Sequence, residues 1–101
     1  MASVSYRPEV LAKLRAWGAA AVEIGFRDEF LRALREMETR LRTDPEAWGD
    51  PLRDLRGMRL TEYRRYGPVF VVLYEVHIDG TPVFVWDVRL TPNSILADLL
   101  N

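Results

Sequence analysis

The sequence predicts a single α+β domain: an N-terminal helical hairpin packed on an antiparallel β-sheet of three to four strands, with a short C-terminal helix. Three observations lead to this expectation. Apolar residues recur at helical spacing between residues 9 and 42, three runs rich in Val, Phe, Tyr and Trp lie between residues 58 and 90, and tight-turn signals separate these runs. A chain of 101 residues has room for one such domain.

Two amphipathic helices are expected first. Pro8 suits the first turn of a helix because its missing N–H would have no partner there, and Gly25 is typical of a helix end. The second helix runs from Phe26 to Arg42 and ends before Asp44-Pro45, since the residue before a proline is disfavoured in the α region. About three residues join the two helices, which predicts an antiparallel hairpin whose apolar stripes need a sheet to cover.

The sheet is expected mainly in the second half of the chain. Residues 2–6 form a candidate first strand, and residues 44–57, with two prolines and two glycines, are expected to be a loop with a helical turn at 46–48. A three-stranded meander should follow, because Gly67-Pro68 and Asp79-Gly80 are turn signals between Met58–Tyr66, Val69–Ile78 and Pro82–Leu90. Ser94 then caps a short helix that runs through Leu100.

Alternation assigns the two faces of this sheet. We expect the aromatic pairs Phe70/Tyr74 and Phe84/Trp86 to lie under the helices, with Val88. The opposite face then carries a mixed polar row of Glu75, His77, Asp87 and Arg89. This alignment requires a Gly80 bulge after a type I turn, because a one-residue slip would exchange the faces of one strand.

Composition narrows the classes of function. There is no cysteine, so disulfides, thiolate metal sites and thiol nucleophiles are excluded. The formal net charge is -1 and the pI about 5.8, which argues against a dedicated nucleic-acid binder, although 13 of the 14 basic residues are arginines. The sequence lacks a signal peptide and an apolar run of membrane-spanning length, so we expect a cytoplasmic protein without membrane contact.

No standard nucleotide, metal or hydrolase motif is present, and we expect no cofactor or metal. His77 is the only histidine; it is either an ordinary strand residue or a lone general base. Glu75 and Asp87 could divide acid and base roles, or arginines could simply neutralise them. Arg59, Tyr63 and Arg65 should project from one face of their strand, where they would clamp phosphates and stack bases or be solvated edge residues.

The order of elements and several short motifs resemble the RelE/ParE family of small bacterial toxins. The motifs are Asp50-Pro51-Leu52 with Leu55 and Gly57, the arginine-bearing strand 58–66, the run Val72-Leu73-Tyr74-Glu75-Val76, and Val85 to Arg89. The resemblance implies a RelE/ParE-like fold over residues 1–101 and an antitoxin partner that folds onto the hairpin or the basic face of the sheet. For the ribonuclease members it implies that Arg59 or Arg65 and Arg89 stabilise phosphate charge, with His77, Glu75 or Asp87 as base.

One departure from the family separates its two activities. The segment after Arg89, Leu90-Thr91-Pro92-Asn93-Ser94, holds no Tyr, His or Lys to assist proton transfer, and the pI is acidic. We therefore expect a type II toxin–antitoxin protein, or a solitary relative, that acts by protein binding, with DNA gyrase as the next target considered. The alternatives are a metal-independent mRNA endoribonuclease acting at the ribosome and a non-toxic interaction domain. Homodimer formation is left open.

Overall fold

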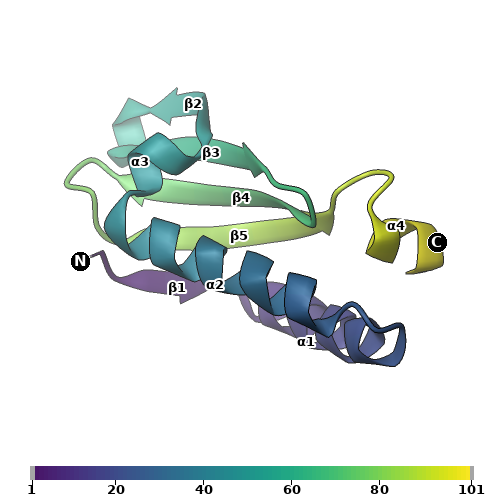
Figure 1. Cartoon of the computed structure of the whole chain (residues 1–101). Helices are drawn as coiled ribbons and strands as arrows, with labels where there is room; N and C mark the ends of the chain where they lie inside the picture. Colours follow the sequence, from purple (N-terminus) through teal and green to yellow (C-terminus); the bar gives the residue numbers. More distant parts are fainter. Residues whose placement is uncertain (1, 101) are drawn as a thin grey trace.

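A computed structural model describes residues 2–100 and has one layer of helices against one five-stranded sheet (Figure 1). The elements run in the order β1 (Val4–Tyr6), α1 (Pro8–Glu23), α2 (Arg27–Thr43), α3 (Pro45–Trp48), β2 (Asp50–Leu55), a 3-10 turn η1 (Arg56–Met58), β3 (Leu60–Tyr66), β4 (Phe70–His77), β5 (Val83–Leu90) and α4 (Ile95–Leu100). The α+β class, the helical hairpin, the turn at 46–48 and the C-terminal helix are confirmed. None of these helices is long and apolar enough to cross a membrane, within the described residues.

The sheet is larger than expected and it is mixed. Its strand order is β1-β5-β4-β3-β2, with β1 parallel to β5 and every other pair antiparallel. The prediction of three to four antiparallel strands missed β2. Its sequence, Asp50-Pro-Leu-Arg-Asp-Leu, has no apolar alternation because β2 is an exposed edge strand, stabilised by pairing with β3 rather than by burial.

The hydrophobic core lies between the helical hairpin and one face of the sheet. Phe70 at its centre contacts the rings of Trp17 from α1 and Phe30 from α2, at centroid distances of 6.0 and 5.3 Å. Leu96 of α4 is also fully buried, and the Ser94 hydroxyl accepts a hydrogen bond from the Ala97 N–H at 3.2 Å, as expected of a helix cap.

A β-bulge in β5 corrects the predicted faces of that strand. Leu73 pairs with Asp87 but Tyr74 pairs with Val85, so Trp86 is an extra residue that shifts the alternation by one. Val83 and Val85 are therefore fully buried against the helices, and the expectation that Phe84 lies there is wrong, because Phe84 pairs with Glu75 on the other face.

Beyond the bulge the predicted alternation is correct again. Val88 faces the core, and Asp87 and Arg89 lie on the opposite face. The predicted Gly80 bulge does not give the expected alignment at the turn before β5, because directly beside this turn Val76 pairs with Val83 and Glu75 with Phe84. The Gly80 N–H donates to the His77 carbonyl at 2.8 Å, and Gly80 has a φ of 82°, which is the left-handed region.

Candidate functional site

The face of the sheet opposite the helices, which we call the open face, brings polar groups from β3, β4 and β5 together. The strand register arranges them in cross-strand rows. From one end of the sheet to the other, these rows are Tyr66–Val71–Arg89, then Arg64–Leu73–Asp87, then Glu62–Glu75–Phe84, and finally Leu60–His77. The predicted mixed row of Glu75, His77, Asp87 and Arg89 does share this face.

The four residues predicted as catalytic do not lie close together in the structure. They are Arg59, Arg65, His77 and Arg89. Arg65 pairs with Val72 and so lies on the helix-covered face, where its guanidinium donates to the Trp48 carbonyl at 3.1 Å and lies 5.6 Å from the Trp48 ring. Tyr63 shares that face, stacked on Tyr74 at 5.4 Å. The predicted pairing of Tyr63 with Arg65 on one face is confirmed, but that face is covered.

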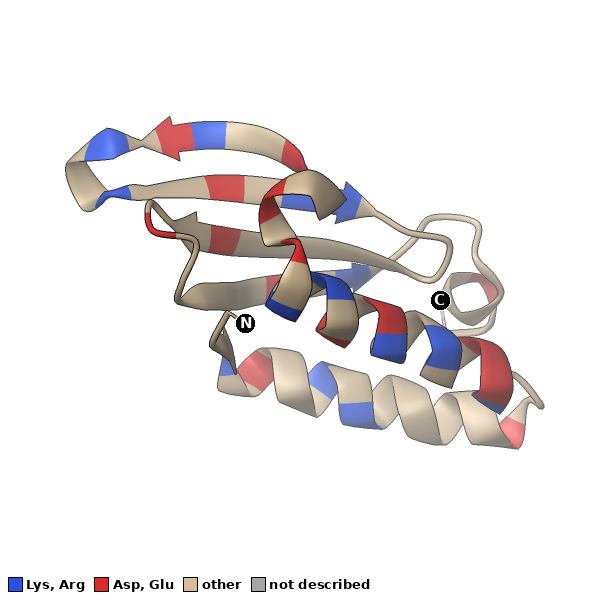
Figure 2. Cartoon of the chain, turned by 60° about the vertical axis from the view of Figure 1, so that its left-hand side comes forward, with Lys and Arg blue, Asp and Glu red and all other residues tan. Residues whose placement is uncertain are grey.

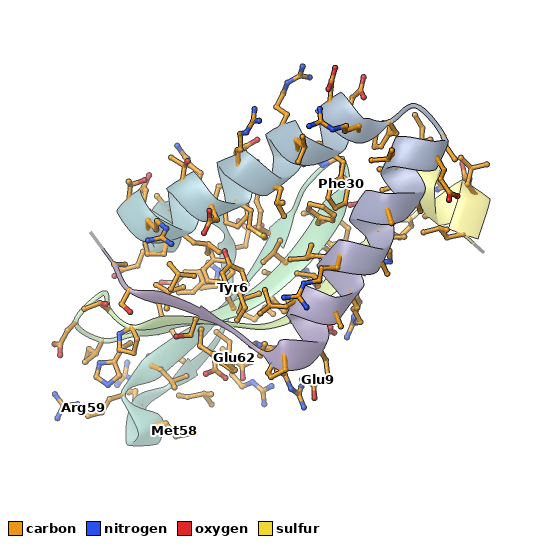
Figure 3. The ribbon with its side chains drawn as sticks, turned by 90° about the horizontal axis from the view of Figure 1, so that it is seen from below. Tyr6, Glu9, Phe30, Met58, Arg59 and Glu62 are labelled. Carbon is orange, nitrogen blue, oxygen red and sulfur yellow. The ribbon has the colours of Figure 1, made fainter. Side chains whose placement is uncertain are left out.

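Arg59 lies six residues before Arg65, about 20 Å along the strand direction, and it is not part of β3. It follows η1 in the left-handed conformation, with a φ of 58°, and its carbonyl accepts from the Ile78 N–H at 2.8 Å. Figure 3 shows Arg59 and Met58 at the tip of the β2–β3 hairpin. His77 lies at this same end of the sheet, whereas Arg89 is opposite Val71, six residues away along β4. That separation is about 20 Å.

His77 is partly exposed and has one nearby carboxylate. Its Nδ1 is 3.7 Å from the Asp79 carboxylate and has no hydrogen-bond partner among the described residues. In the same part of the chain, residues 2–100, no group of three His, Asp or Glu side chains is placed to hold a metal ion.

Asp87 is the centre of an ion triad at the Arg89 end of the open face. Its carboxylate accepts from Lys13 Nζ at 2.8 Å and from Arg89 Nε at 3.1 Å, and Lys13 also donates to the Val88 carbonyl at 3.1 Å. Burial disfavours the charged form of Asp87, but the hydrogen bonds and charges of Lys13 and Arg89 outweigh it and lower the pKa of Asp87. Asp87 is therefore ionised and a poor proton acceptor.

Glu75 has the opposite electrostatic environment. It lies directly across from Glu62, whose carboxylate is held by Arg53 of β2 at 3.2 Å. Partial burial and the charge of Glu62 both raise the pKa of Glu75. The middle of the open face is thus acidic, and of the two predicted carboxylates Glu75 is the better proton acceptor.

Arg64 and Tyr66 were not among the predicted site residues, although they lie on the open face beside the triad. The Arg64 guanidinium lies 5.3 Å from the centre of the Tyr66 ring, and within residues 2–100 Arg64 has no carboxylate partner. The signal was present in the alternation of β3, because residues 64 and 66 must face away from Tyr63 and Arg65. Lys13 had no such signal, since its contact with Asp87 spans 74 positions.

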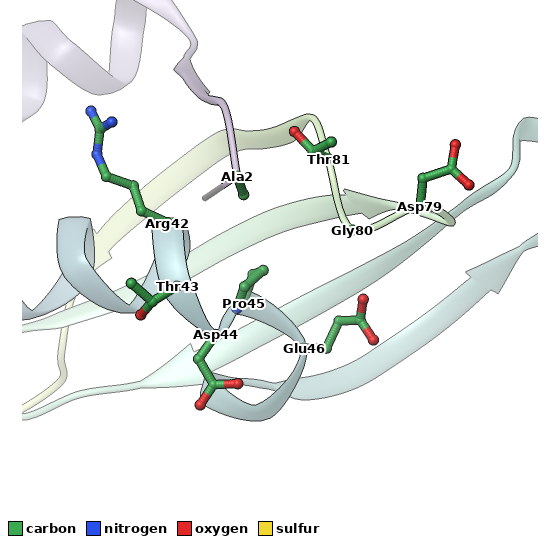
Figure 4. Close-up of a pocket in the computed structure, with 9 residues that line it drawn as sticks. All are labelled: Ala2, Arg42, Thr43, Asp44, Pro45, Glu46, Asp79, Gly80 and Thr81. Carbon is green, nitrogen blue, oxygen red and sulfur yellow. The ribbon is translucent and has the colours of Figure 1, made fainter.

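Three surface cavities adjoin these elements. A cavity of about 570 Å³ beside the triad is bounded by α1, the end of β5 and α4, and includes Lys13, Trp17 and Arg89. A groove of about 330 Å³ between α1 and α2 is lined mainly by apolar side chains. A third, of about 640 Å³, lies between the end of α2 and the β4–β5 turn, and Figure 4 shows that its carboxylates do not converge on one point.

The comparisons with known proteins bear on the fold. No protein-family model matches the sequence, and no curated protein is significantly similar to it. Among solved structures, the chain is similar to a chain of the archaeal RelE–RelB complex from Pyrococcus horikoshii OT3, with a TM-score of 0.63 and 18% sequence identity. The similarity covers 92% of this chain and 98% of that one. The expected RelE/ParE-like fold is therefore confirmed: this chain has the fold of the RelE protein.

Proposed function

We propose that this chain is the toxin-fold component of a type II toxin–antitoxin system, or a solitary relative, and that it acts by binding protein. The observation that carries the proposal is the fold shared over 92% of the chain with a protein solved as a RelE–RelB complex. A partner that plays the part of RelB is an antitoxin segment, which is disordered alone and folds on binding.

The groove between α1 and α2 is the surface that best fits such a segment. Its apolar lining consists of Leu11, Leu14, Leu34 and Met37, and Arg15 and Glu38 are among its polar side chains. Tyr6 also lines it, and burial, followed by the charge of Glu38, raises the pKa of Tyr6 to about 12. The buried Tyr6 hydroxyl has no hydrogen-bond partner in residues 2–100, so a polar group of a docked segment could supply one.

The geometry favours binding over catalysis. Arg65 is engaged with Trp48 on the covered face, and Arg59 and Arg89 lie at opposite ends of the sheet. Arg89 is also partly neutralised by Asp87, and the Glu62–Glu75 pair in the middle of the open face repels a polyanion. A protein target such as gyrase does not require a basic surface.

A second function, metal-independent cleavage of mRNA, has one specific observation in its favour. Arg64, Tyr66 and Arg89 occupy neighbouring rows at one end of the open face, where two guanidinium groups could hold a phosphate and an aromatic ring could stack a base. Glu75, in the next row, would act as the base of this reaction.

Induced expression separates these functions. Growth arrest with intact mRNA, retained in an Arg64→Ala/Arg89→Ala variant, supports protein binding. The nuclease function is established instead if mRNA is cleaved and the cleavage is lost in that variant. An Arg32→Ala/Arg35→Ala control, on the exposed side of α2, should still cleave. If high expression leaves growth unchanged, both toxin functions are wrong and the chain is an interaction domain.

The antitoxin is tested through the gene next to this one. Co-expression of its product should relieve the arrest and yield a purified complex. Leu11→Glu, at an exposed position of the groove, should weaken that complex, while Leu52→Glu, at an exposed leucine on β2, should not. A complex that tolerates Leu11→Glu would place the antitoxin elsewhere, and the absence of any complex would contradict the antitoxin itself.

A further inference from the structure

The outer face of α1 is apolar, in contrast to the outer face of α2. Between Arg15 and Glu23 the helix has no charged residue, and Ala16, Ala19 and Val22 are exposed to solvent there. Figure 2 shows this uncharged stretch of α1 beside an α2 that alternates basic and acidic residues along its length. An isolated surface helix would be expected to carry polar residues on this face, as α2 does.

Other exposed apolar side chains gather at the same end of the molecule. Helix α4 contacts α1, and Figure 1 shows it beside the α1–α2 connection. Half of the ten large apolar side chains that are exposed in residues 2–100 lie here: Val22, Ile24, Ile95, Leu99 and Leu100. An exposed apolar surface of this kind marks an interaction site more often than chance.

Two residues of opposite charge, Arg15 and Glu23, flank the apolar stretch of α1. Arg15 and Glu23 both lie on the exposed side, and among the described residues neither has an ion-pair partner. They are eight residues apart, which is about 12 Å along a helix. If a second copy of α1 lies antiparallel with Ala19 opposite Ala19 of the copy, each Arg15 is level with Glu23 of the other copy. The surface is therefore self-complementary, as a two-fold interface requires.

We propose that a second copy of this chain docks antiparallel on the outer face of α1, with Ala16 and Ala19 at the contact and two reciprocal Arg15–Glu23 ion pairs between the copies. Small side chains allow two helix axes to approach to about 8–10 Å. A contact of a few helical turns is smaller than a standard interface, which buries roughly 1,200–2,000 Å², so the dimer dissociates at micromolar concentrations.

This surface differs from the groove proposed for an antitoxin. The groove lies on the side of α1 that faces α2, and Ala16, Ala19 and Glu23 do not line it; Arg15 lies at its border and belongs to both surfaces. Dimer formation therefore does not depend on the proposed toxin function.

Sedimentation equilibrium of the full chain from about 1 µM to about 1 mM tests the proposal. The mass should rise from 11.7 kDa toward twice that value. Arg15→Glu and Glu23→Arg, tested separately, should each weaken the dimer by about tenfold, because each replaces two attractive pairs by two repulsive ones. An equimolar mixture of the two variants should recover the dimer, since both ion pairs reappear between unlike copies. Arg32→Glu, on the outer face of α2, is the matched control and should have no effect.

A third variant tests the apolar contact itself. Ala19→Glu places two carboxylates at the two-fold axis and should leave a monomer, whereas Ala47→Glu, at an exposed position of α3, should leave the dimer intact. Thermal unfolding of each variant checks that it is folded. A chain that stays monomeric up to about 1 mM, a mixture that does not recover the dimer, or a dimer that tolerates Ala19→Glu would each overturn the proposal. The proposal would also be overturned if the chain is monomeric and Ala19→Glu disrupts the antitoxin complex, because the outer face of α1 would then bind the antitoxin.

Discussion

Replacing Asp87 by Asn should destabilise the protein at neutral pH, because Asp87 anchors α1 to an otherwise unpaired edge of the sheet. Strand β1 pairs only with Val83–Val85, so the later part of β5 has no neighbouring strand on that side. Lys13 of α1 reaches this edge instead and contacts both the Asp87 carboxylate and the Val88 carbonyl. The substitution removes the negative charge on which Lys13 and Arg89 converge.

The size of the effect follows from the exposure of the three side chains. The Asp87 side chain is 20% exposed, that of Lys13 42% and that of Arg89 65%. The half-buried Lys13 contact should contribute more than an ordinary surface pair and the Arg89 contact only a few tenths, for a sum of about 1 to 1.5 kcal/mol. In a domain of this size that loss lowers the melting temperature by about 5 to 10 °C.

The effect should also depend on pH in a defined direction. Because the pKa of Asp87 is lowered in the folded state, its contribution is complete above the ordinary Asp pKa of about 3.9 and is lost as the pH falls through the folded value. Thermal unfolding followed by circular dichroism should therefore show the full difference between wild type and Asp87→Asn at pH 7 and a smaller difference at pH 2.5.

The matched control is Asp54→Asn. Asp54 pairs with Arg56 at 3.0 Å, but both side chains are largely exposed, so this change should cost less than about 0.5 kcal/mol. The reasoning is refuted if Asp87→Asn melts within about 2 °C of wild type at pH 7. It is equally refuted if the difference between the two proteins is unchanged at pH 2.5, since the loss would then come from packing and not from charge.

Three further changes test the core and the open face. A Cβ at Gly49 would lie 2.5 Å from the Tyr74 hydroxyl oxygen and 3.1 Å from the Arg64 carbonyl oxygen, so Gly49→Ala should cost about 1 to 3 kcal/mol in urea unfolding, whereas Gly57→Ala, in open space, should not. Tyr74→Phe should cost about 1 to 2 kcal/mol in the same assay, because the fully buried Tyr74 hydroxyl donates a hydrogen bond to the Pro45 carbonyl at 2.6 Å. An unchanged urea midpoint would show that this hydrogen bond does not stabilise the protein. Glu75→Gln should stabilise the protein by about 0.2 to 1 kcal/mol at pH 7, because it relieves the repulsion between Glu75 and Glu62. Since the pKa of Glu75 is raised in the folded state, this gain in stability should vanish below about pH 4. A loss of stability at pH 7 would contradict this electrostatic account.

The sequence predicted those elements whose residues report their own environment. Helix α2 was predictable because its apolar stripe has a clear helical period, and the central strand β4 because it is a continuous run of aromatic and branched apolar residues followed by Glu75 and His77. Strand β2 was not, since an edge strand held by backbone pairing needs no apolar residues. The faces of β5 required knowledge of the bulge at Trp86, which depends on the partner strand.

The same distinction applies to the candidate site. The expected roles of Arg59, Arg65 and Arg89 came from the RelE/ParE resemblance by position along the chain, and such positions do not determine which side chains lie together in space. A left-handed backbone removes Arg59 from the strand, and the face shared with Tyr63 turns Arg65 toward the helices. Arg64 and Tyr66, which share one end of the open face with Arg89 across β4, can be assigned to this face only when the face covered by the helices is known.

The distribution of arginines, rather than their number, determines what this scaffold can bind. Seven of the thirteen have a carboxylate within 4.0 Å: Arg7, Arg27, Arg40, Arg42, Arg53, Arg56 and Arg89. The other six are dispersed over α1, α2, the hairpin tip and both faces of the sheet. A polyanion gains affinity by contacting many uncompensated cations at once, and within residues 2–100 only Arg64 is such a cation on the open face. A protein partner can instead match the basic end and the acidic middle of this face, since complementary charges confer specificity without a basic excess. The open face is therefore better suited to a protein than to RNA, which is why arrest with intact mRNA is the outcome we expect.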